Sequence, residues 1–307
     1  MNDKLITLFG GGGFVGRYVA QALLAAGARV RVAQRDPRQA WFLKPLGGLG
    51  QTQFVAADVM KPVTIARAIA GADAVVNLVG SFDRMAAIHV DGARRIAEAA
   101  AAEAVEALVH FSAIGADAAS PAAYGRTKAA GESAVREAFA AATIVRPSIV
   151  FGREDQFTNR FAAMIASLPV VPVLREQAKF QPVYVRDVAA AVVAALADPA
   201  AHGGRTYELG GPDVLSMGEI YAFLADAVQR HPAMPALPDA LGQLLTLVPG
   251  SGISRDQWKM LGRDTVVAPG AEGLEALGVV PTPLASAAPA WLVRYRRHGR
   301  FAKRQPA

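Results

Sequence analysis

The sequence predicts a doubly wound α/β fold, with a parallel sheet between two layers of helices and a smaller C-terminal lobe. Three observations carry this prediction. Apolar runs of strand length alternate with helical stretches over residues 1–150, a glycine-rich loop separates the first run from the first helical stretch, and prolines interrupt the helical periods afterwards. Strand–helix alternation with short connections is typical of a parallel sheet that is buried on both faces.

The predicted elements of the sheet domain follow one another along residues 1–150. Short apolar runs predict strands over 5–10, 29–35, 52–58, 74–80, 107–113 and 142–147. Alanine-rich or amphipathic stretches predict helices over 14–26, 62–70, 85–104 and 121–139. A helix over 183–196 and a strand over 205–211 return residues 183–211 to this domain. The smaller lobe is then expected to comprise 151–182 and 212–307.

The glycine loop after the first strand reads "GGGGFVG", from Gly10 to Gly16. Gly10 permits the sharp turn out of the strand, Gly13 lets the backbone approach a pyrophosphate, and Gly16 lets the helix pack closely on the sheet. Phe14 and Val15 complete the turn and open the helix, whose positive end suits an anion. The sequence therefore predicts a Rossmann-like domain that binds a dinucleotide here.

The end of the second strand bears on which dinucleotide is bound. Folds that prefer NAD place an acidic residue there, whereas this chain has Gln34 and Arg35. Arg35 suits a 2′-phosphate, and Arg17 in the first turn of the helix is unfavourable unless an anion lies nearby. Asp36 is the alternative, because it would bind a ribose hydroxyl if the strand ended one residue later. We expect NADP(H) in preference to NAD(H).

Other residues are expected around the same cofactor. Asp58 and Val59 follow the third strand and are placed to contact the adenine, although Asp58 is equally suited to a turn or a helix N-cap. Residues 146–152 are expected to line the nicotinamide end. The candidate contacts from this group and from the end of the fourth strand are Val79, Gly80, Pro147 and Ile149.

The stretch "SPAAYGRTK" places Tyr124 and Lys128 four residues apart on one face of a predicted helix, with Ser120 as its expected N-cap. An ammonium beside a phenol lowers the pKa of the phenol and can also bind a nicotinamide ribose. The phenol can then give a proton to a carbonyl as hydride arrives. Ser112, at the end of the fifth strand, is the candidate third hydroxyl, either as a vestigial catalytic group or as a cofactor contact.

Composition excludes several kinds of chemistry. There is no cysteine, which excludes disulfides and thiolate nucleophiles, and the five histidines show no metal-ligand spacing. No signal peptide or apolar run of membrane-spanning length is visible, so a soluble or surface-attached protein is expected. Asp187 is expected to cap a helix or to pair with an arginine, not to act as a base.

The formal net charge of +6 is unevenly placed, because no acidic residue follows Glu275. The stretch 291–307 interleaves six basic residues with Trp291, Tyr295 and Phe301. It is either a solvated tail or a docking segment for an acidic protein face or an anionic lipid surface. No nucleic-acid-binding module is recognisable.

Several motifs together carry a resemblance to known proteins. The glycine triplet, Asp58, "NLVG", "YGRTK" and "VRPSIVFG" resemble the extended or atypical branch of the short-chain dehydrogenase/reductase superfamily, which is related to sugar epimerases. "QPVYVRDVAAAV", "ISRDQWKMLGRDTVV" and "LEALGVVPTPLASAAPAWLVRYR" narrow the resemblance to the alpha-subcomplex subunit 9 family of respiratory complex I. The likeness runs from about residue 4 to 301.

The resemblance implies a tightly held NADPH and an accessory or assembly role on the peripheral arm of complex I. Because Met1 leads directly into the fold, a bacterial member on the cytoplasmic side of the inner membrane is expected. In the epimerase-like branch the working hydroxyl lies late in a Ser/Thr run, where this chain has Ile114. That departure places catalysis in question and leaves cofactor binding untouched.

Two other functions stay open from the sequence. One is a free-standing reductase or epimerase/dehydratase acting on an unknown carbonyl or sugar. The other is a redox sensor that reads the NADPH/NADP ratio and passes it to a partner. The C-terminal motifs and the basic tail favour the accessory subunit.

Overall fold

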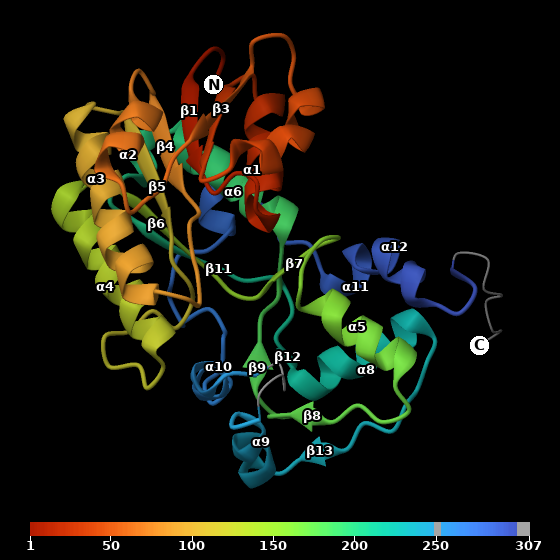
Figure 1. Cartoon of the computed structure of the whole chain (residues 1–307). Coiled ribbons are helices and arrows are strands. Elements are labelled where there is room, and N and C mark those ends of the chain that lie inside the picture. Colours follow the sequence, from red (N-terminus) through yellow and green to blue (C-terminus); the bar gives the residue numbers. More distant parts are fainter. Residues whose placement is uncertain (249–252, 300–307) are drawn as a thin grey trace. The chain divides into compact units, whose positions relative to one another are not determined.

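The computed structural model of this protein describes residues 1–248 and 253–299. The chain divides into two compact units (Figure 1). The first comprises Met1–Pro147, Val185–Leu209 and Val267–Val280. The second comprises Ser148–Tyr184, Gly210–Val266 and the described residues from Pro281 onward.

The first unit is built on a seven-stranded sheet in which every neighbouring pair is parallel. Its strands in spatial order are β11 (Thr206–Leu209), β6 (Thr143–Pro147), β5 (Ala107–Phe111), β4 (Ala74–Asn77), β1 (Leu5–Phe9), β2 (Arg29–Gln34) and β3 (Thr52–Ala56). The chain runs from β1 outward to β3 and then crosses back to β4. This reversal between β1 and β4 marks the place where a doubly wound sheet binds ligands. The predicted fold class is confirmed.

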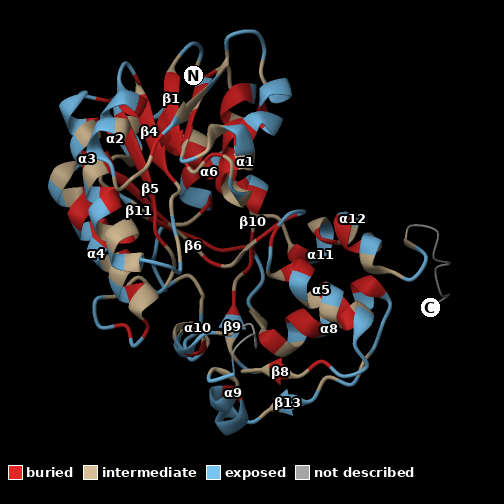
Figure 2. Cartoon of the chain, viewed as in Figure 1, coloured by how far each residue is buried: buried red, intermediate tan, exposed pale blue. Residues whose placement is uncertain are grey.

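Helices cover both faces of the sheet. They are α1 (Phe14–Ala25), α2 (Pro62–Ile69), α3 (Ala93–Ala102), α4 (Ala123–Ala138) and α6 (Val185–Ala197). The helix α1 packs against α6, whereas α2, α3 and α4 pack side by side (Figure 1). Because both faces are covered, β1 and β5 are buried at every position, as Figure 2 shows, and their sequences are almost continuously apolar.

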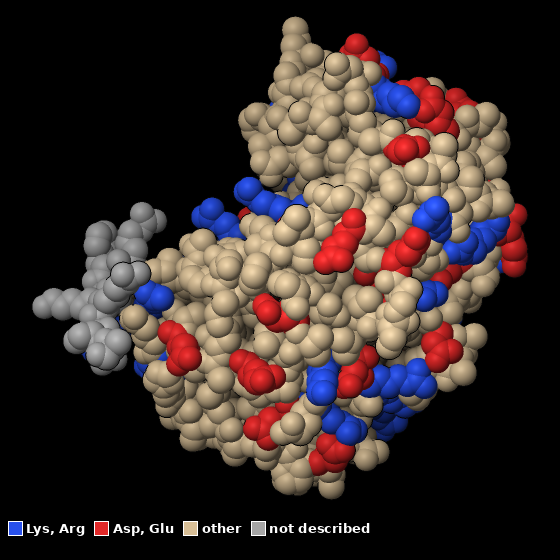
Figure 3. Space-filling view, turned by 180° about the vertical axis from the view of Figure 1, so that it is seen from behind, with Lys and Arg blue, Asp and Glu red and all other residues tan. Residues whose placement is uncertain are grey.

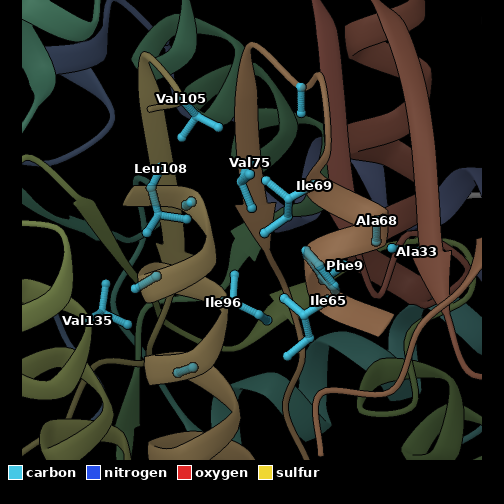
Figure 4. Close-up of a cluster of buried hydrophobic side chains, with 14 of the residues drawn as sticks. Phe9, Ala33, Ile65, Ala68, Ile69, Val75, Ile96, Val105, Leu108 and Val135 are labelled. Atoms are coloured by element: carbon cyan, nitrogen blue, oxygen red, sulfur yellow. The ribbon is translucent and has the colours of Figure 1, made fainter. Parts of the chain in front are cut away.

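The core beneath α2, α3 and α4 joins those helices to the sheet. Figure 4 shows Ile65 and Ile69 of α2 and Ile96 of α3 directed toward Val75 and Leu108 of the strands. All five side chains are almost fully buried. This packing fixes the position of α4, which carries Tyr124 and Lys128.

Three local features differ from the sequence-based expectation. The predicted helix 85–104 begins with a π-helical turn, η2 (Ala87–Gly92), before α3. The predicted helix 121–139 begins at Ala123, and Ser120 is not its N-cap, because its hydroxyl accepts from the N–H of Ala122 in the preceding turn instead. A 3₁₀ helix that the sequence did not predict, η1 (Pro37–Leu46), follows β2.

A segment expected in the smaller lobe belongs to the first unit. The N–H of Ala268 donates to the carboxylate of Glu208 at 2.9 Å, and the N–H of Glu208 donates to the carbonyl of Glu272 at 2.9 Å. Arg205 adds an ion pair to Glu272 at 2.8 Å. These bonds hold Val267–Val280 along the edge strand β11. The short 3₁₀ helix η3 (Glu275–Leu277) lies in this segment, and α7 (Pro199–His202) precedes β11.

The second unit contains short strand pairs and a helical core. The pairs are β7 (Val150–Phe151) with β10 (Val183–Tyr184), β9 (Lys179–Phe180) with β12 (Leu215–Ser216), and β8 (Val173–Leu174) with β13 (Ala236–Leu237). The helices are α5 (Thr158–Ser167), α8 (Met217–Val228), α9 (Asp239–Leu245), α10 (Arg255–Met260), α11 (Leu284–Ala287), α12 (Pro289–Leu292) and the 3₁₀ turn η4 (Val293–Tyr295). The helices α5 and α8 pack together around an apolar and aromatic cluster.

The beginning of the expected docking tail is part of this core. Trp291 is buried and its ring is stacked on that of Tyr184 at 6.3 Å between centroids. Tyr295 donates its hydroxyl hydrogen to Asn159, and the Nε of Arg296 donates to the carbonyl of Ala227 at 2.8 Å. Residues 291–296 are therefore part of the fold, so the alternative of a solvated tail does not hold for them, and a docking role stays a prediction. Residues 300–307 lie outside the described residues.

Charges are mixed over the surface that Figure 3 shows, where basic and acidic side chains alternate instead of forming one patch. Within residues 1–248 and 253–299, no helix is long and apolar enough to cross a membrane. The same residues contain no cluster of three or more potential metal ligands.

Candidate functional site

The glycine loop turns from β1 into α1 as the sequence predicts. Gly10 has a φ of +81°, which a side chain would strain, and a Cβ on Gly16 would lie 2.3 Å from the carbonyl oxygen of Gly10. The N-cap of helix α1 is Gly13, which has no side chain to bond the first N–H groups of the helix. Those N–H groups and the positive helix end are consequently available to an anion.

A cavity of about 970 Å³ opens beside this loop, at the carboxyl ends of the strands. It is bounded by the glycine loop, the end of β2, the turn after β3 and the loop after β4. The predicted site residues that line it are Gly10, Gly13, Arg35, Asp58, Val59, Val79 and Gly80. Its position at the reversal of strand order is the one expected for a nucleotide in such a sheet.

Several predicted residues do not line this cavity. In the first unit they are Phe14, Val15, Gly16, Arg17, Ser112, Tyr124, Lys128 and Pro147. Ile149 belongs to the second unit. The guanidinium of Arg17 lies over the ring of Phe42 in η1, 4.5 Å from its centroid. This cation–π contact accommodates the charge in the first turn of α1 without requiring an anion.

Gln34 has a role that the sequence did not suggest. Its side-chain oxygen accepts from the N–H of Gly12 at 2.9 Å, and its amide nitrogen donates to the carbonyl of Asp36 at 2.7 Å. A Cβ on Gly12 would lie 2.3 Å from that oxygen. Gln34 therefore fixes the glycine loop to the end of β2. The signal was its position in the sequence, at the end of the second strand.

Asp36 is occupied by a neighbour. Arg38 donates to both of its carboxylate oxygens, at 2.9 and 3.1 Å, and the N–H of Arg38 makes a third bond at 3.1 Å. The hydrogen bonds from Arg38 lower the pKa of the Asp36 carboxyl. Arg35, by contrast, is exposed on the cavity and has no hydrogen bond or ion pair within the described part of the chain.

Asp58 takes part in a local turn. Its carboxylate accepts from the N–H of Met60 at 2.9 Å, and its backbone bonds the hydroxyl of Thr64. The residue nevertheless lines the cavity, so the turn role and a cofactor contact are compatible. Met60 and Lys61 also line the cavity and were not expected there.

Tyr124 and Lys128 lie on α4 as predicted, with the ammonium 5.8 Å from the centroid of the phenol ring. Lys128 is buried and donates to the carbonyl of Phe111 at 3.0 Å. Burial lowers the pKa of Lys128 to about 8, an effect that Glu132 partly offsets. Burial raises the pKa of Tyr124 to about 12, which contradicts the expectation that the lysine lowers it.

Ser112 directly follows β5, and Phe111, the residue before it, accepts from Lys128. The Ser112 side chain is 4% exposed, and its hydroxyl has no hydrogen-bond partner among the described residues. His110 is also buried and accepts from the amide of Asn77 on β4 at 3.1 Å. A buried hydroxyl without a partner is unfavourable, so Ser112 is suited to a polar ligand group.

His89 was not predicted as a site residue, yet it connects the cavity to α4. Its Nε2 accepts from the N–H of Ser81 at 3.1 Å, so the neutral ring carries its proton on Nδ1. That nitrogen lies 3.0 Å from the hydroxyl of Thr127, which donates to the carbonyl of Tyr124 at 3.1 Å. His89 sits in the π-helical turn η2, a feature frequent at functional sites.

Three further positions that the sequence singled out take part in the fold. Arg146, expected near the nicotinamide, forms ion pairs with Glu132 at 2.6 Å and Glu208 at 3.3 Å. Both carboxylates are largely buried, so this arginine joins α4 to the edge of the sheet. Asp187 is buried in the first turn of α6, and Ile114 donates its N–H to the carbonyl of Pro147 at 3.1 Å.

Comparisons with known proteins agree with this geometry. Residues 6–210 match the profile of the NAD dependent epimerase/dehydratase family. The NADH dehydrogenase [ubiquinone] 1 alpha subcomplex subunit 9 of Arabidopsis thaliana is 34% identical over 95% of this chain and 78% of that protein. The protein of the same name from Mus musculus is 33% identical over 92% of this chain and 78% of its own length.

Solved structures share the fold at lower identity. The triphenylmethane reductase of Citrobacter sp., determined with NADP(H), matches with a TM-score of 0.77 and 17% identity. The match covers 93% of this chain and 99% of that one.

Proposed function

The chain belongs to the NAD dependent epimerase/dehydratase family and, within it, to the relatives of alpha-subcomplex subunit 9, and from that premise we propose that it is an NADP(H)-binding accessory subunit of respiratory complex I. It stabilises or assembles the peripheral arm, on the cytoplasmic side of a bacterial inner membrane, without regular turnover. The observation that carries the proposal is the extent of the likeness to subunit 9, which reaches 95% of the chain and so includes the second unit.

The residues present fit an NADP(H) cofactor. The free N–H groups at the start of α1 and Gly13 receive the pyrophosphate, and Arg35 binds the 2′-phosphate. Because Arg38 holds Asp36, its carboxylate is not free for the ribose hydroxyl that NAD presents. Arg35 is therefore a charged group available where the 2′ position of the ribose would lie, and this supports NADP(H) in preference to NAD(H).

We assign the binding of the nicotinamide end of the cofactor to residues around β5 and α4. Lys128 has two ammonium hydrogens beyond its bond to Phe111, and these suit the ribose hydroxyls. The unpartnered hydroxyl of Ser112 adds a further polar contact. The bound cofactor supplies a hydride donor, but the roles assigned to these side chains need no substrate.

Two features of this chain argue against efficient reduction of a carbonyl. Ile114 occupies the place where the catalytic hydroxyl is expected, and removing one such donor typically lowers a rate by a hundredfold or more. The raised pKa of Tyr124, about 12, also makes the phenol a weaker acid than free tyrosine. A bound cofactor that is not consumed stabilises the fold by mass action instead.

A free-standing reductase or epimerase is the second candidate. It is favoured by the buried Ser112 hydroxyl, which lies next in sequence to the carbonyl that holds Lys128. In that role, Ser112 would polarise the carbonyl in place of Ile114, and Tyr124 would give the proton.

Purification from native membranes separates the two candidates. The accessory role predicts that the protein travels with complex I subunits and carries NADP(H), identified by mass spectrometry of the released nucleotide. Tyr124→Phe should leave both properties intact. A protein that migrates alone, and that reduces a carbonyl in a Tyr124-dependent way, would establish the reductase instead.

A further inference from the structure

The 3₁₀ helix η1 and the turn that follows it expose large apolar side chains instead of burying them. Four side chains in this short segment are at least 41% exposed, and they form what we call the η1 surface: Trp41, Phe42, Leu46 and Leu49. Within η1 only Ala40 and Leu43 are buried. Large apolar side chains that gather on a surface mark a contact with another molecule more often than isolated ones do.

A defined turn projects Leu49 into solvent. The N–H of Gln51 donates to the carbonyl of Gly48 at 3.2 Å, and the N–H of Gly48 donates to the side-chain oxygen of Gln51 at 2.6 Å. Gly50 has a φ of +79°, a conformation that glycine adopts without strain. Leu49 is 108% exposed at this turn. The fold therefore holds a leucine fully in water, where its transfer to an apolar phase would be favourable.

The same segment of the chain carries an excess of positive charge. Residues 37–57 contain no Asp and no Glu. The ammonium of Lys44 lies over the ring of Trp41, 4.3 Å from its centroid, and forms no ion pair with any residue that the structure describes. The guanidinium of Arg17 lies over the ring of Phe42. Each exposed aromatic ring therefore has a cation beside it.

We propose that the η1 surface, together with Lys44, binds an anionic lipid bilayer. Leu46 and Leu49 enter the boundary between the head groups and the acyl chains. Trp41 lies at the level of the head groups, where tryptophan is favoured, and the ammonium beside its ring meets the lipid phosphates. The surface is separate from the basic residues 300–307, and the proposal does not depend on assembly with complex I.

Two features favour a bilayer over a protein partner. Leu49 projects from a turn whose neighbouring residues are glycines, a shape that enters between lipid head groups without a matching recess in the partner. The cations lie beside the aromatic rings, so apolar surface and positive charge occur together, as they do in segments that lie in the bilayer interface. The centre of a protein interface, by contrast, is depleted of charge, because burying a cation there is unfavourable.

The test measures co-sedimentation of the full-length protein with vesicles of phosphatidylglycerol and phosphatidylcholine, or of phosphatidylcholine alone. Leu49→Ser should bind both kinds of vesicle about tenfold more weakly, because a leucine side chain no longer enters the apolar phase. Lys44→Gln should bind the anionic vesicles about fivefold more weakly, the loss expected for one basic residue near such a surface. Val280→Ser, at an apolar position that is 85% exposed, is the matched control and should bind like the unaltered chain.

Trp41 provides a second measurement that reports on its own surroundings. The other two tryptophans, Trp258 and Trp291, are buried, so a change of tryptophan emission on vesicle binding is expected to come from Trp41. Vesicles with brominated acyl chains should quench this emission. Trp41→Phe should lose the vesicle-dependent change while it still sediments with the vesicles.

Four outcomes decide the proposal. Equal vesicle binding by Leu49→Ser and the unaltered chain would overturn the η1 surface as the binding site. Binding of the unaltered chain without quenching by brominated acyl chains would overturn its insertion. Failure to bind either kind of vesicle, or a dimer in solution that Leu49→Ser dissociates, would assign the surface to a protein partner instead.

Two controls keep this test separate from other properties of the chain. High salt screens the charges of residues 300–307 but should leave the effect of Leu49→Ser in place, so the two segments are distinguished. The content of NADP(H) and co-purification with complex I subunits in detergent should be the same for all variants. A failure of either in the unaltered chain concerns the accessory role alone.

Discussion

Arg38 clamps Asp36 with a bidentate ion pair, and Arg35 is left facing the cavity. The three residues are close in sequence, yet only the structure distinguishes their roles. The sequence left open whether Asp36 would bind a ribose hydroxyl. The ion pair engages both carboxylate oxygens of Asp36, and the proposed cofactor assignment therefore gives the 2′-phosphate to Arg35.

Arg35→Ala should weaken NADPH binding by roughly tenfold to a hundredfold, the usual loss of a hydrogen bond to a charged group. NADH binding should change little, because NADH lacks the 2′-phosphate. Arg94→Ala removes an exposed arginine on α3, whose guanidinium lies 3.9 Å from the carboxylate of Glu137, and serves as the control. Titrations with both nucleotides check this, and an equal loss for NADH and NADPH would contradict the assignment of Arg35.

Arg38→Ala tests whether the ion pair with Arg38 keeps Asp36 from binding a ribose hydroxyl. Release of the Asp36 carboxylate should improve NADH binding relative to NADPH, since the freed acid can accept from the ribose hydroxyl. The ratio of the two dissociation constants is the quantity to measure. If this ratio is unchanged in Arg38→Ala, Asp36 lies too far from the ribose to bind it, even when Arg38 does not hold the carboxylate.

Lys128 should make the cofactor-free protein more stable as the pH rises from about 8 to 10.5. Its pKa is about 8 in the folded chain and near 10.5 when unfolded, so the unfolded state binds more protons in that window and the free energy of unfolding increases with pH. The gain is on the order of 3 kcal/mol at most. Urea unfolding at pH 7.5 and 10 should show the stability difference between Lys128→Met and the unaltered chain shrinking with pH. Lys259→Met, at an exposed position on α10, should show no such trend.

His89 should make the protein less stable as the pH falls from about 6.5 to 4. Burial, aided by the charge of Lys128, lowers the pKa of His89 to about 4, so the unfolded chain takes up a proton first. The loss reaches about 3 kcal/mol over that window. His89→Gln keeps an acceptor for Ser81 without the titration and should make the profile shallower, while the buried His110, whose pKa burial lowers to about 3, keeps the remaining slope. His231→Gln, at an exposed position, should leave it unchanged, and parallel profiles for all three proteins would refute the burial argument.

How well the sequence predicted each feature depends on how far apart in the chain the interacting residues lie. The sheet, the glycine turn and the pairing of Tyr124 with Lys128 on one helix depend on local periodicity and spacing, and the sequence indicated each of them. The roles of Gln34 and of the π-helical His89 depend on contacts between segments distant in sequence, such as Gly12 with Gln34 and His89 with Thr127. Alternation of residue types carries no information about such contacts.

Two further features, the pKa of Tyr124 and the packing of the C-terminal segment, also depend on contacts that local sequence patterns do not reveal. Four-residue spacing placed the lysine beside the phenol, but burial, which depends on the whole fold, determined the sign of the shift. From the sequence, residues 291–296 were either a solvated tail or a docking segment, and the packing of Trp291 on Tyr184 contradicts the solvated tail.

We expect Trp291 to contribute to the stability of the fold and residues 300–307 to act through their charge. Deletion of 300–307 removes three basic residues and leaves the described core intact, so the melting temperature should not change. Trp291→Ala should destabilise the second unit by about 3–5 kcal/mol, as is usual for a buried aromatic side chain. Thermal unfolding of both variants tests this division.

If the deleted residues dock on an acidic or anionic surface, membrane co-sedimentation should weaken in the deletion variant at low salt, and the difference should vanish at high salt because charges are screened. A deletion that lowers the melting temperature as much as Trp291→Ala would place residues 300–307 in the fold instead.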